Sequence, residues 1–190
     1  MKGYIYITSN GTDPGLYNNL NDPLFGKVPT LGACMPNIRR LVTKGDYIFV
    51  VSGKAPGVQQ YVVGGMRVEE KISALAAHAR FPQNRLKLGS NGLEGNIIVR
   101  ADGTQHELDG HDADTFESRI ENFIVGSHGI SLSEPAEIER GRVETLGKLS
   151  EILHRPRANR VIDILGRWSR LEERQIADIL DWLAGIKTSG

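Results

Sequence analysis

A thiol and two arginines lie within a few residues of one another in this chain. Cys34, Asn37, Arg39 and Arg40 surround Pro36, which suits the first turn of a helix. Positive charge and a helix start both lower a thiol pKa, so Cys34 is a candidate nucleophile. The amides at the helix start, with the arginines, are equally candidate phosphate ligands. No partner histidine for Cys34 is identifiable, so we favour a packed, unreactive cysteine. For the arginines, the alternative to a phosphate site is a solvated cationic helix face.

Histidines and acids are concentrated in residues 106–114, where they could supply metal ligands or acid and base groups. The members are His106, Glu107, Asp109, His111, Asp112 and Asp114. The spacing lacks the His-Glu-x-x-His pattern of a zinc enzyme. We therefore favour a solvated loop and expect no metal site. The single cysteine also excludes an internal disulfide and disfavours a cysteine-based zinc site.

The most cationic part of the chain is residues 154–170. We expect its arginines to contact nucleic acid: Arg155, Arg157, Arg160 and Arg167. Trp168 follows them, and arginine combined with an aromatic ring suits phosphate contact and base stacking. The alternative is that Trp168 belongs to the core and that nearby acids dilute the positive charge.

Composition limits the classes of function. The chain has 190 residues, 39% hydrophobic and 24% charged residues and a net charge of zero, which is typical of one globular domain. A protein that coats long duplex DNA usually carries a basic excess, so that class is disfavoured. The start of the chain lacks a signal-peptide pattern, and no run approaches the length of a membrane helix. We expect a soluble, cytoplasmic protein.

Three strands and one helix are expected to position the residues around Pro36. Residues 4–7, 47–52 and 61–68 have the β-branched and aromatic composition of strands. The helix that starts at Pro36 places Ile38, Leu41 and Val42 on one face, with Arg39 and Arg40 elsewhere, and Gly45 ends it. Gly64 and Gly65 inside a strand predict a bulge, a bend or the close approach of a backbone or ligand.

The remaining pattern predicts a fold of the α+β class. We expect a helix over residues 71–79, a hairpin joining 96–100 to 105–108, a short strand at 123–126 and a helix over 137–153. Ser169 and Glu172 match a capping box, and Gly185 would end the helix that follows. Strands first and helices last favour α+β over a doubly wound sheet.

The stretch from Phe25 to Glu69 resembles the nucleotide modification associated domain 2 family. The resemblance rests on Thr-Leu-x-x-Cys-x-Pro-x-Ile-Arg at residues 30–39, on Gly-Asp at 45–46 and on Met-x-Val at 66–68. It implies association with systems that make, recognise or restrict modified nucleotides in DNA, often in phage or phage-defence settings. The order Gly-Asp, strand, turn, Val-Val-Gly-Gly-Met-Arg-Val is also similar to PUA-like domains, including the EVE, YTH and ASCH groups. That similarity implies a curved mixed sheet or small barrel with flanking helices.

These observations lead to one main hypothesis for fold and function. We expect a PUA-like α+β core over residues 1–130 and a helical extension over 131–190 packed on the same domain. The protein would be a binding module for a modified nucleotide or base in nucleic acid. Tyr4, Tyr6 or Tyr47 would stack on the base, and no cofactor is needed. The expected ligand-binding residues are Ser9, Asn10, Cys34, Asn37, Arg39, Arg40 and Ser52.

Two other functions remain open at this stage. One is an enzyme acting on nucleotides or modified bases, with Cys34 or residues 106–114 supplying the reactive groups. The other is a sensor or sequestering protein for a small nucleotide signal, working as an oligomer. Net charge near zero mildly favours a small ligand over a long duplex.

Overall fold

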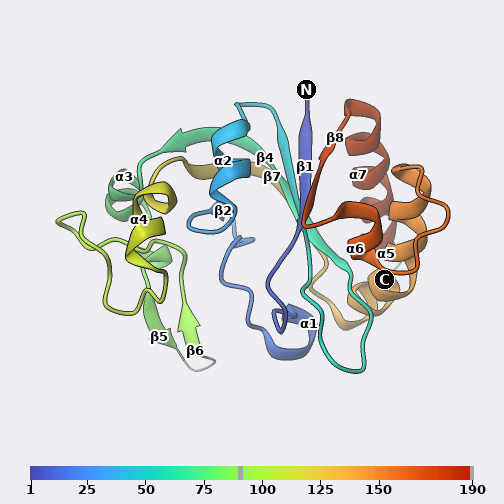
Figure 1. Ribbon diagram of the computed structural model, residues 1–190, viewed down its shortest axis with the longest axis horizontal. Helices are drawn as coiled ribbons and strands as arrows, with labels where there is room; N and C mark the ends of the chain where they lie inside the picture. The colour runs from blue at the N-terminus through green and yellow to red at the C-terminus, as the bar shows by residue number, and fades with distance from the viewer. Residues whose placement is uncertain (90–91, 189–190) are drawn as a thin grey trace. The chain divides into compact units, whose positions relative to one another are not determined.

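The computed structural model describes residues 1–89 and 92–188 (Figure 1). The strands are β1 (Gly3–Ile7), β2 (Thr30–Leu31), β3 (Tyr47–Val51), β4 (Val62–Ile72), β5 (Lys87–Gly89), β6 (Gly92–Glu94), β7 (Phe123–Ser131) and β8 (Trp168–Leu171). The helices are α1 (Pro14–Tyr17), α2 (Pro36–Leu41), α3 (Ala74–Arg80), the 3₁₀ turn η1 (Pro82–Asn84), α4 (Ala113–Ile120), α5 (Pro135–Ile152), α6 (Val161–Leu165) and α7 (Glu173–Lys187).

The larger sheet is mixed and open. Its strand order is β2-β7-β4-β3-β1-β8, and β5 pairs with β6 in a separate two-stranded sheet. Strand β1 runs parallel to β3 and antiparallel to β8. The α+β class and the helical carboxyl-terminal region are therefore confirmed. Among the described strands, β2 and β8 remain edges, so the sheet is not closed into the small barrel that was one of our two expectations.

The chain divides into two compact units. The first unit contains Met1–Asn18, Asp46–Met66 and the described residues from His128 onward. The second unit contains Asn19–Gly45 and Arg67–Ser127. Our division at residue 130 stays a prediction.

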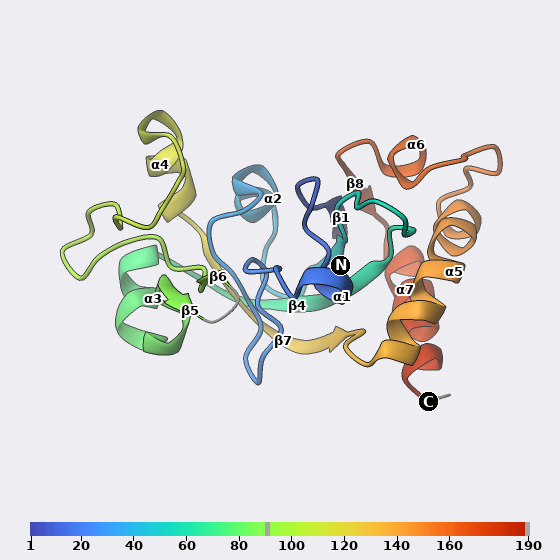
Figure 2. The ribbon, with the colours of Figure 1, turned by 90° about the horizontal axis from the view of Figure 1, so that it is seen from below.

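In the first unit, helices pack closely on β1 and on each other. A Cβ added at Gly3 would lie 2.9 Å from the side chain of Ile176 on α7. Helices α5 and α7 lie side by side (Figure 2). A Cβ at Gly65 would overlap the ring of Phe49, and one at Gly64 would overlap the backbone of Ile130 on β7. The paired glycines therefore serve the close approach of protein groups, which is one of the alternatives we expected.

In the second unit, alanine, aromatic and β-branched side chains form a core cluster. Ala77 of α3 is fully buried, and Phe81 stacks on Phe123 with the ring centroids 6.3 Å apart. Helix α3, expected to start at residue 71, starts at Ala74. Strand β4 extends to Ile72, and the Ser73 side chain then caps the helix by accepting from the Ala76 N–H.

Two expected elements differ in the structure. Ser169 lies in β8, and its hydroxyl donates to the carbonyl of Leu165, so it is not available to cap α7. The capping box belongs to Glu172 and Gln175 instead, and α7 continues past Gly185. The expected hairpin over residues 96–108 is reduced to an isolated bridge between Val99 and Gln105.

Within the described residues, no helix has both the length and the apolar character needed to cross a membrane.

Candidate functional site

A buried carboxylate holds the segment before α2 in the second unit. Asp22 accepts hydrogen bonds from the backbone N–H groups of Gly32 at 2.7 Å, Ala33 at 2.8 Å and Cys34 at 2.5 Å. The side-chain amide of Asn96 donates to the same carboxylate at 2.9 Å. The amides just ahead of α2, where we considered a phosphate site, are thus satisfied by the chain's own carboxylate.

The guanidinium of Arg39 is fully buried in the second unit. It donates to backbone carbonyl groups that come from the segment before α2 and from the end of α4: Ala33, Cys34, Arg119, Glu121 and Asn122. Carbonyls at a helix carboxyl end carry partial negative charge, which a buried cation stabilises. Arg39 therefore joins the Cys34 segment to α4. Our prediction that Arg39 projects from the packed face was wrong, and Leu41, expected in the core, is 40% exposed.

The thiol of Cys34 is kept protonated by its surroundings. Burial, followed by the negative charge of Asp22 and a hydrogen bond to it, raises the pKa of Cys34 to about 12. Arg119 and Arg39 act in the opposite direction but are outweighed. A thiolate nucleophile at neutral pH is therefore disfavoured, in agreement with our preference for a packed cysteine.

Two of the four residues expected to bind a ligand near Pro36 (Cys34, Asn37, Arg39 and Arg40) are exposed to solvent. Asn37 and Arg40 are exposed on α2. The backbone carbonyl of Arg40 accepts a hydrogen bond from Lys71 Nζ at 2.9 Å. Of the four cluster residues expected to bind a ligand, these two can contact one without rearrangement.

The other expected pocket residues lie in the first unit, in the segments that follow β1 and β3. Ser52 is fully buried, and its hydroxyl accepts from the N–H of Tyr61 at 3.0 Å. Ser9 and Asn10 are exposed. A Cβ at Gly53 would overlap the carbonyl oxygen of Ser9, so the two segments touch through their backbones. Ser9 and Asn10 are the accessible members of this set.

The tyrosines expected to stack on a base are largely inside the first unit. Tyr4 is 4% exposed and Tyr6 is 1% exposed. Tyr47 is half-buried and stacks on Phe49 at 6.0 Å. Trp168 on β8 is 37% exposed and lies 5.8 Å from the Tyr4 ring.

The histidine and acid segment forms a local hydrogen-bonded loop in the second unit. The Asp109 side chain is 2% exposed, and its carboxylate lies 2.5 Å from Nδ1 of His111. Gln105 Nε2 donates to the second oxygen of Asp109 at 2.8 Å. Within residues 1–89 and 92–188, no three His, Cys, Asp or Glu side chains gather as a metal site requires.

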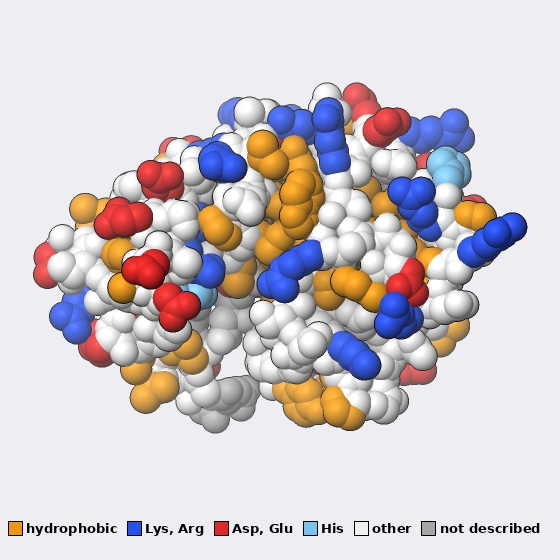
Figure 3. Space-filling model, in the orientation of Figure 1, with side chains coloured by type: hydrophobic (Ala, Val, Ile, Leu, Met, Phe, Trp, Pro, Cys, Tyr) orange, Lys and Arg blue, Asp and Glu red, His pale blue; other side chains and the backbone are white. Residues whose placement is uncertain are grey.

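The arginines of the segment 155–174 are exposed on the first unit. Arg160 pairs with Asp163 at 2.7 Å. Within the described residues, no carboxylate lies at ion-pair distance from five others: Arg155, Arg157, Arg167, Arg170 and Arg174. Figure 3 shows Lys and Arg side chains over the region where Figure 1 places α6, β8 and the loop before α6. Most exposed cations elsewhere, such as Arg80 and Arg100, have an acidic partner.

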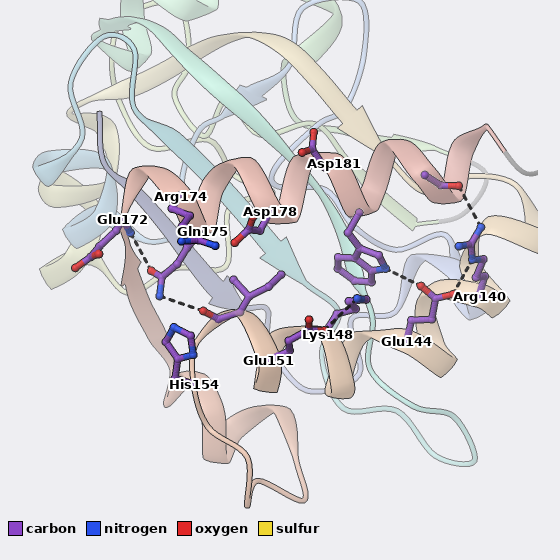
Figure 4. Close-up of a pocket in the computed structure, with 13 residues that line it drawn as sticks. Arg140, Glu144, Lys148, Glu151, His154, Glu172, Arg174, Gln175, Asp178 and Asp181 are labelled. Atoms are coloured by element: carbon purple, nitrogen blue, oxygen red, sulfur yellow. Dashed lines mark hydrogen bonds and ion pairs between the residues drawn. The ribbon is translucent and has the colours of Figure 1, made fainter.

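A groove of about 790 Å³ lies between α5 and α7 (Figure 4). Trp182 Nε1 donates to Glu144 at 2.7 Å, and Arg140 donates to the same carboxylate at 2.7 Å. Hydrogen bonds from Arg140 and then Trp182 hold the pKa of Glu144 below its usual value. Gln175 on α7 donates to the carbonyl of Ile152 on α5 at 3.3 Å. These hydrogen bonds join α5 to α7, so we interpret the groove as part of the packing interface between the two helices.

One family model matches the segment that contains both the Asp22 carboxylate and the Cys34–Arg39 motif. Residues 4–92 match the family described as nucleotide modification associated domain 2. The match confirms the resemblance found in the motif and extends it from β1 to the start of β6. Neither the curated proteins nor the solved structures provide a match to the chain. The family description associates this part of the chain with nucleotide modification.

Sequence reasoning missed Asp22. Asp22 lies in a polar loop ten residues before its first amide partner, and nothing in its neighbourhood marks it as buried. Arg174 extends the exposed cationic surface beyond Arg170, and the same density of arginine would have indicated it.

Proposed function

We propose that this protein is a nucleic-acid-binding module that recognises a modified nucleotide or base. The observation that carries the proposal is the group of five exposed arginines without ion-pair partners among the described residues, in a chain of zero net charge. Binding of phosphate groups to exposed cations without acidic partners is favourable, because the phosphates neutralise the positive charge. The family match supplies the association with modified nucleotides.

Recognition of the modified base would fall to exposed polar side chains. Ser9 and Asn10 follow β1 and are exposed on the first unit, which also carries the exposed arginines. Hydroxyl and amide groups can donate to and accept from a base edge, which phosphate-binding arginines alone cannot read. Ser52 supports this part of the first unit from inside rather than through ligand contact. Asn37 and Arg40, exposed on α2 of the second unit, stay predictions as ligand contacts.

Binding of fluorescently labelled oligonucleotides and of free nucleotides, each with and without base modifications, tests the proposal. The double variant Arg155→Ala/Arg157→Ala should bind more weakly and lower the slope of log affinity against log salt by roughly 1.4, at about 0.7 for each lost single-strand contact. The matched control is Arg80→Ala/Arg100→Ala, which removes the same charge from ion-paired positions. The proposal fails if no oligonucleotide binds at high micromolar concentration, or if both variants lose affinity equally.

A second candidate function is an enzyme acting on nucleotides or modified bases. It is favoured by the hydrogen bond of 2.5 Å that orients His111 against the nearly buried Asp109, an arrangement that can support a general base. Turnover of modified nucleotides, followed by mass spectrometry, should then disappear in His111→Ala and persist in the control His154→Ala. Absence of turnover in the wild type removes this candidate. The small-signal sensor stays a prediction.

A further inference from the structure

Strand β8 presents an aromatic side chain and a cation on the same face. Its four residues alternate, with Trp168 and Arg170 exposed and Leu171 fully buried. Side chains two residues apart in a strand point the same way, about 7 Å apart. Trp168 and Arg170 therefore face solvent on the same side of β8, and their spacing is comparable to the size of one nucleotide.

The backbone beneath these side chains is held in place. Trp168 is opposite Tyr6 in the ladder between β1 and β8, and Arg170 is opposite Tyr4. The carbonyl of Arg167 accepts from the Ile7 N–H at 3.1 Å, which extends the pairing to the residue before the strand. A ligand that contacts β8 would meet side chains on a preformed strand, so little ordering entropy would oppose binding.

The position of Trp168 is unusual for a tryptophan with only a core role. Its ring is tilted by 56° against Tyr4, yet 37% of the residue remains exposed. The other tryptophan, Trp182, is 9% exposed and hydrogen-bonded to Glu144. Arg167 and Arg170, both exposed, flank Trp168 in sequence and have no carboxylate at ion-pair distance within the described residues.

We propose that Trp168 is a stacking platform for an unpaired base and that the surface therefore selects single-stranded nucleic acid over duplex. This inference rests on the proposed nucleic-acid-binding function and names the substrate class of the same surface. Bases in a duplex are stacked on their neighbours, whereas the face of an unpaired base is available to an aromatic ring. Arg170, on the same face of β8, would hold a phosphate next to the stacked base.

Competition between an unmodified oligothymidylate and a duplex of the same length tests the selection. Wild type should prefer the single strand, and Trp168→Ala should lose roughly 5- to 150-fold in single-strand affinity, the range expected for one stacked base. Trp168→Phe keeps an aromatic ring and should retain most of that affinity. Duplex affinity should change little in either variant.

Fluorescence provides a readout that does not depend on the folding of Trp168→Ala. In the background Trp182→Phe the single remaining tryptophan is Trp168, and a stacked base should quench its emission. Equal binding of single strand and duplex without quenching, but still sensitive to Arg155→Ala/Arg157→Ala, overturns the stacking proposal and leaves the binding function intact. Absence of any oligonucleotide binding overturns both.

Discussion

Asp22 holds the backbone of Cys34 and acts electrostatically on its side chain. Its carboxylate accepts from the Cys34 N–H at 2.5 Å, and it adds to the effect of burial in raising the pKa of the thiol. The cysteine of the family motif is thus held next to a negative charge. Covalent catalysis needs the reverse, a positive environment that favours the thiolate. The motif is better suited to shaping the start of α2 than to nucleophilic attack.

Replacement of Asp22 by asparagine should destabilise the second unit. The amide keeps the size of the side chain but can no longer accept from the full set of N–H groups at Gly32, Ala33 and Cys34. Each buried donor left unpaired costs about 1–3 kcal/mol in free energy of unfolding. Urea denaturation measures the change. Asp112→Asn is the control, because Asp112 is exposed and its side chain makes no capping bond; equal stability of both variants would contradict the role of Asp22.

The thiol of Cys34 should react slowly with iodoacetamide in the native protein. Because its pKa is raised to about 12, the thiolate fraction at pH 8 is on the order of a thousandfold below that of an ordinary cysteine. Reaction should become fast in denaturant. Rapid modification of the native protein near neutral pH would show that the thiolate is stabilised after all.

The same raised pKa predicts a pH dependence of stability. The unfolded thiol ionises near pH 9 while the folded thiol stays protonated, so its contribution is complete below that pH and declines as pH rises toward about 12. The free energy of unfolding of wild type relative to Cys34→Ala should therefore be constant at neutral pH and decrease in alkaline solution. A difference that stays constant to high pH would contradict this prediction.

Glu137 should contribute to stability at neutral pH and lose that contribution in acid. Burial opposes its ionisation, but hydrogen bonds from Lys187 and from the N–H groups of Ser133 and Glu134 outweigh it and lower its pKa. Stability is therefore present above the unfolded pKa and is lost as pH falls through the folded value. Glu137→Gln should be less stable at pH 7 by about 1–3 kcal/mol. In strong acid it should match wild type.

Glu139→Gln serves as the control for Glu137, because Glu139 is exposed on the same helix. Chemical denaturation between pH 3 and pH 7 provides the comparison. A Glu137→Gln difference that does not narrow in acid would exclude the ion pair with Lys187, whose Nζ lies 2.9 Å from the carboxylate, as its cause.

Local patterns predicted those elements whose stability is local. The runs that became β1 and β3 were visible because apolar, β-branched strand residues record burial. The apolar stripe of α5 indicated the helix but not its buried face, since Val143 is 74% exposed and Arg142 is buried. Ser169 misled because a capping pattern describes only the chain around it. Pairing of that residue with β1 places it in a strand, and no local signal reports a partner more than 160 residues away.

The candidate site divides in the same way. The arginines at 155–167 are conspicuous in the sequence because exposed charge is a matter of composition. The environment of Arg39 is not, since its carbonyl partners at the end of α4 lie about 80 residues further along the chain. A buried arginine and an exposed one look alike until the distant acceptors are known.

Arg39 and Arg40 form a matched pair that separates structural support from ligand contact. Arg39→Lys removes the planar fork that reaches several carbonyls at once, and a lysine ammonium cannot replace it. We expect a loss of about 3–5 kcal/mol, comparable to breaking a buried charge network. Arg40→Lys, at an exposed position on the same helix, should change the free energy of unfolding by less than about 0.5 kcal/mol. If Arg39→Lys instead left stability unchanged and weakened nucleotide binding in a titration, Arg39 would be a ligand contact, as the sequence first suggested.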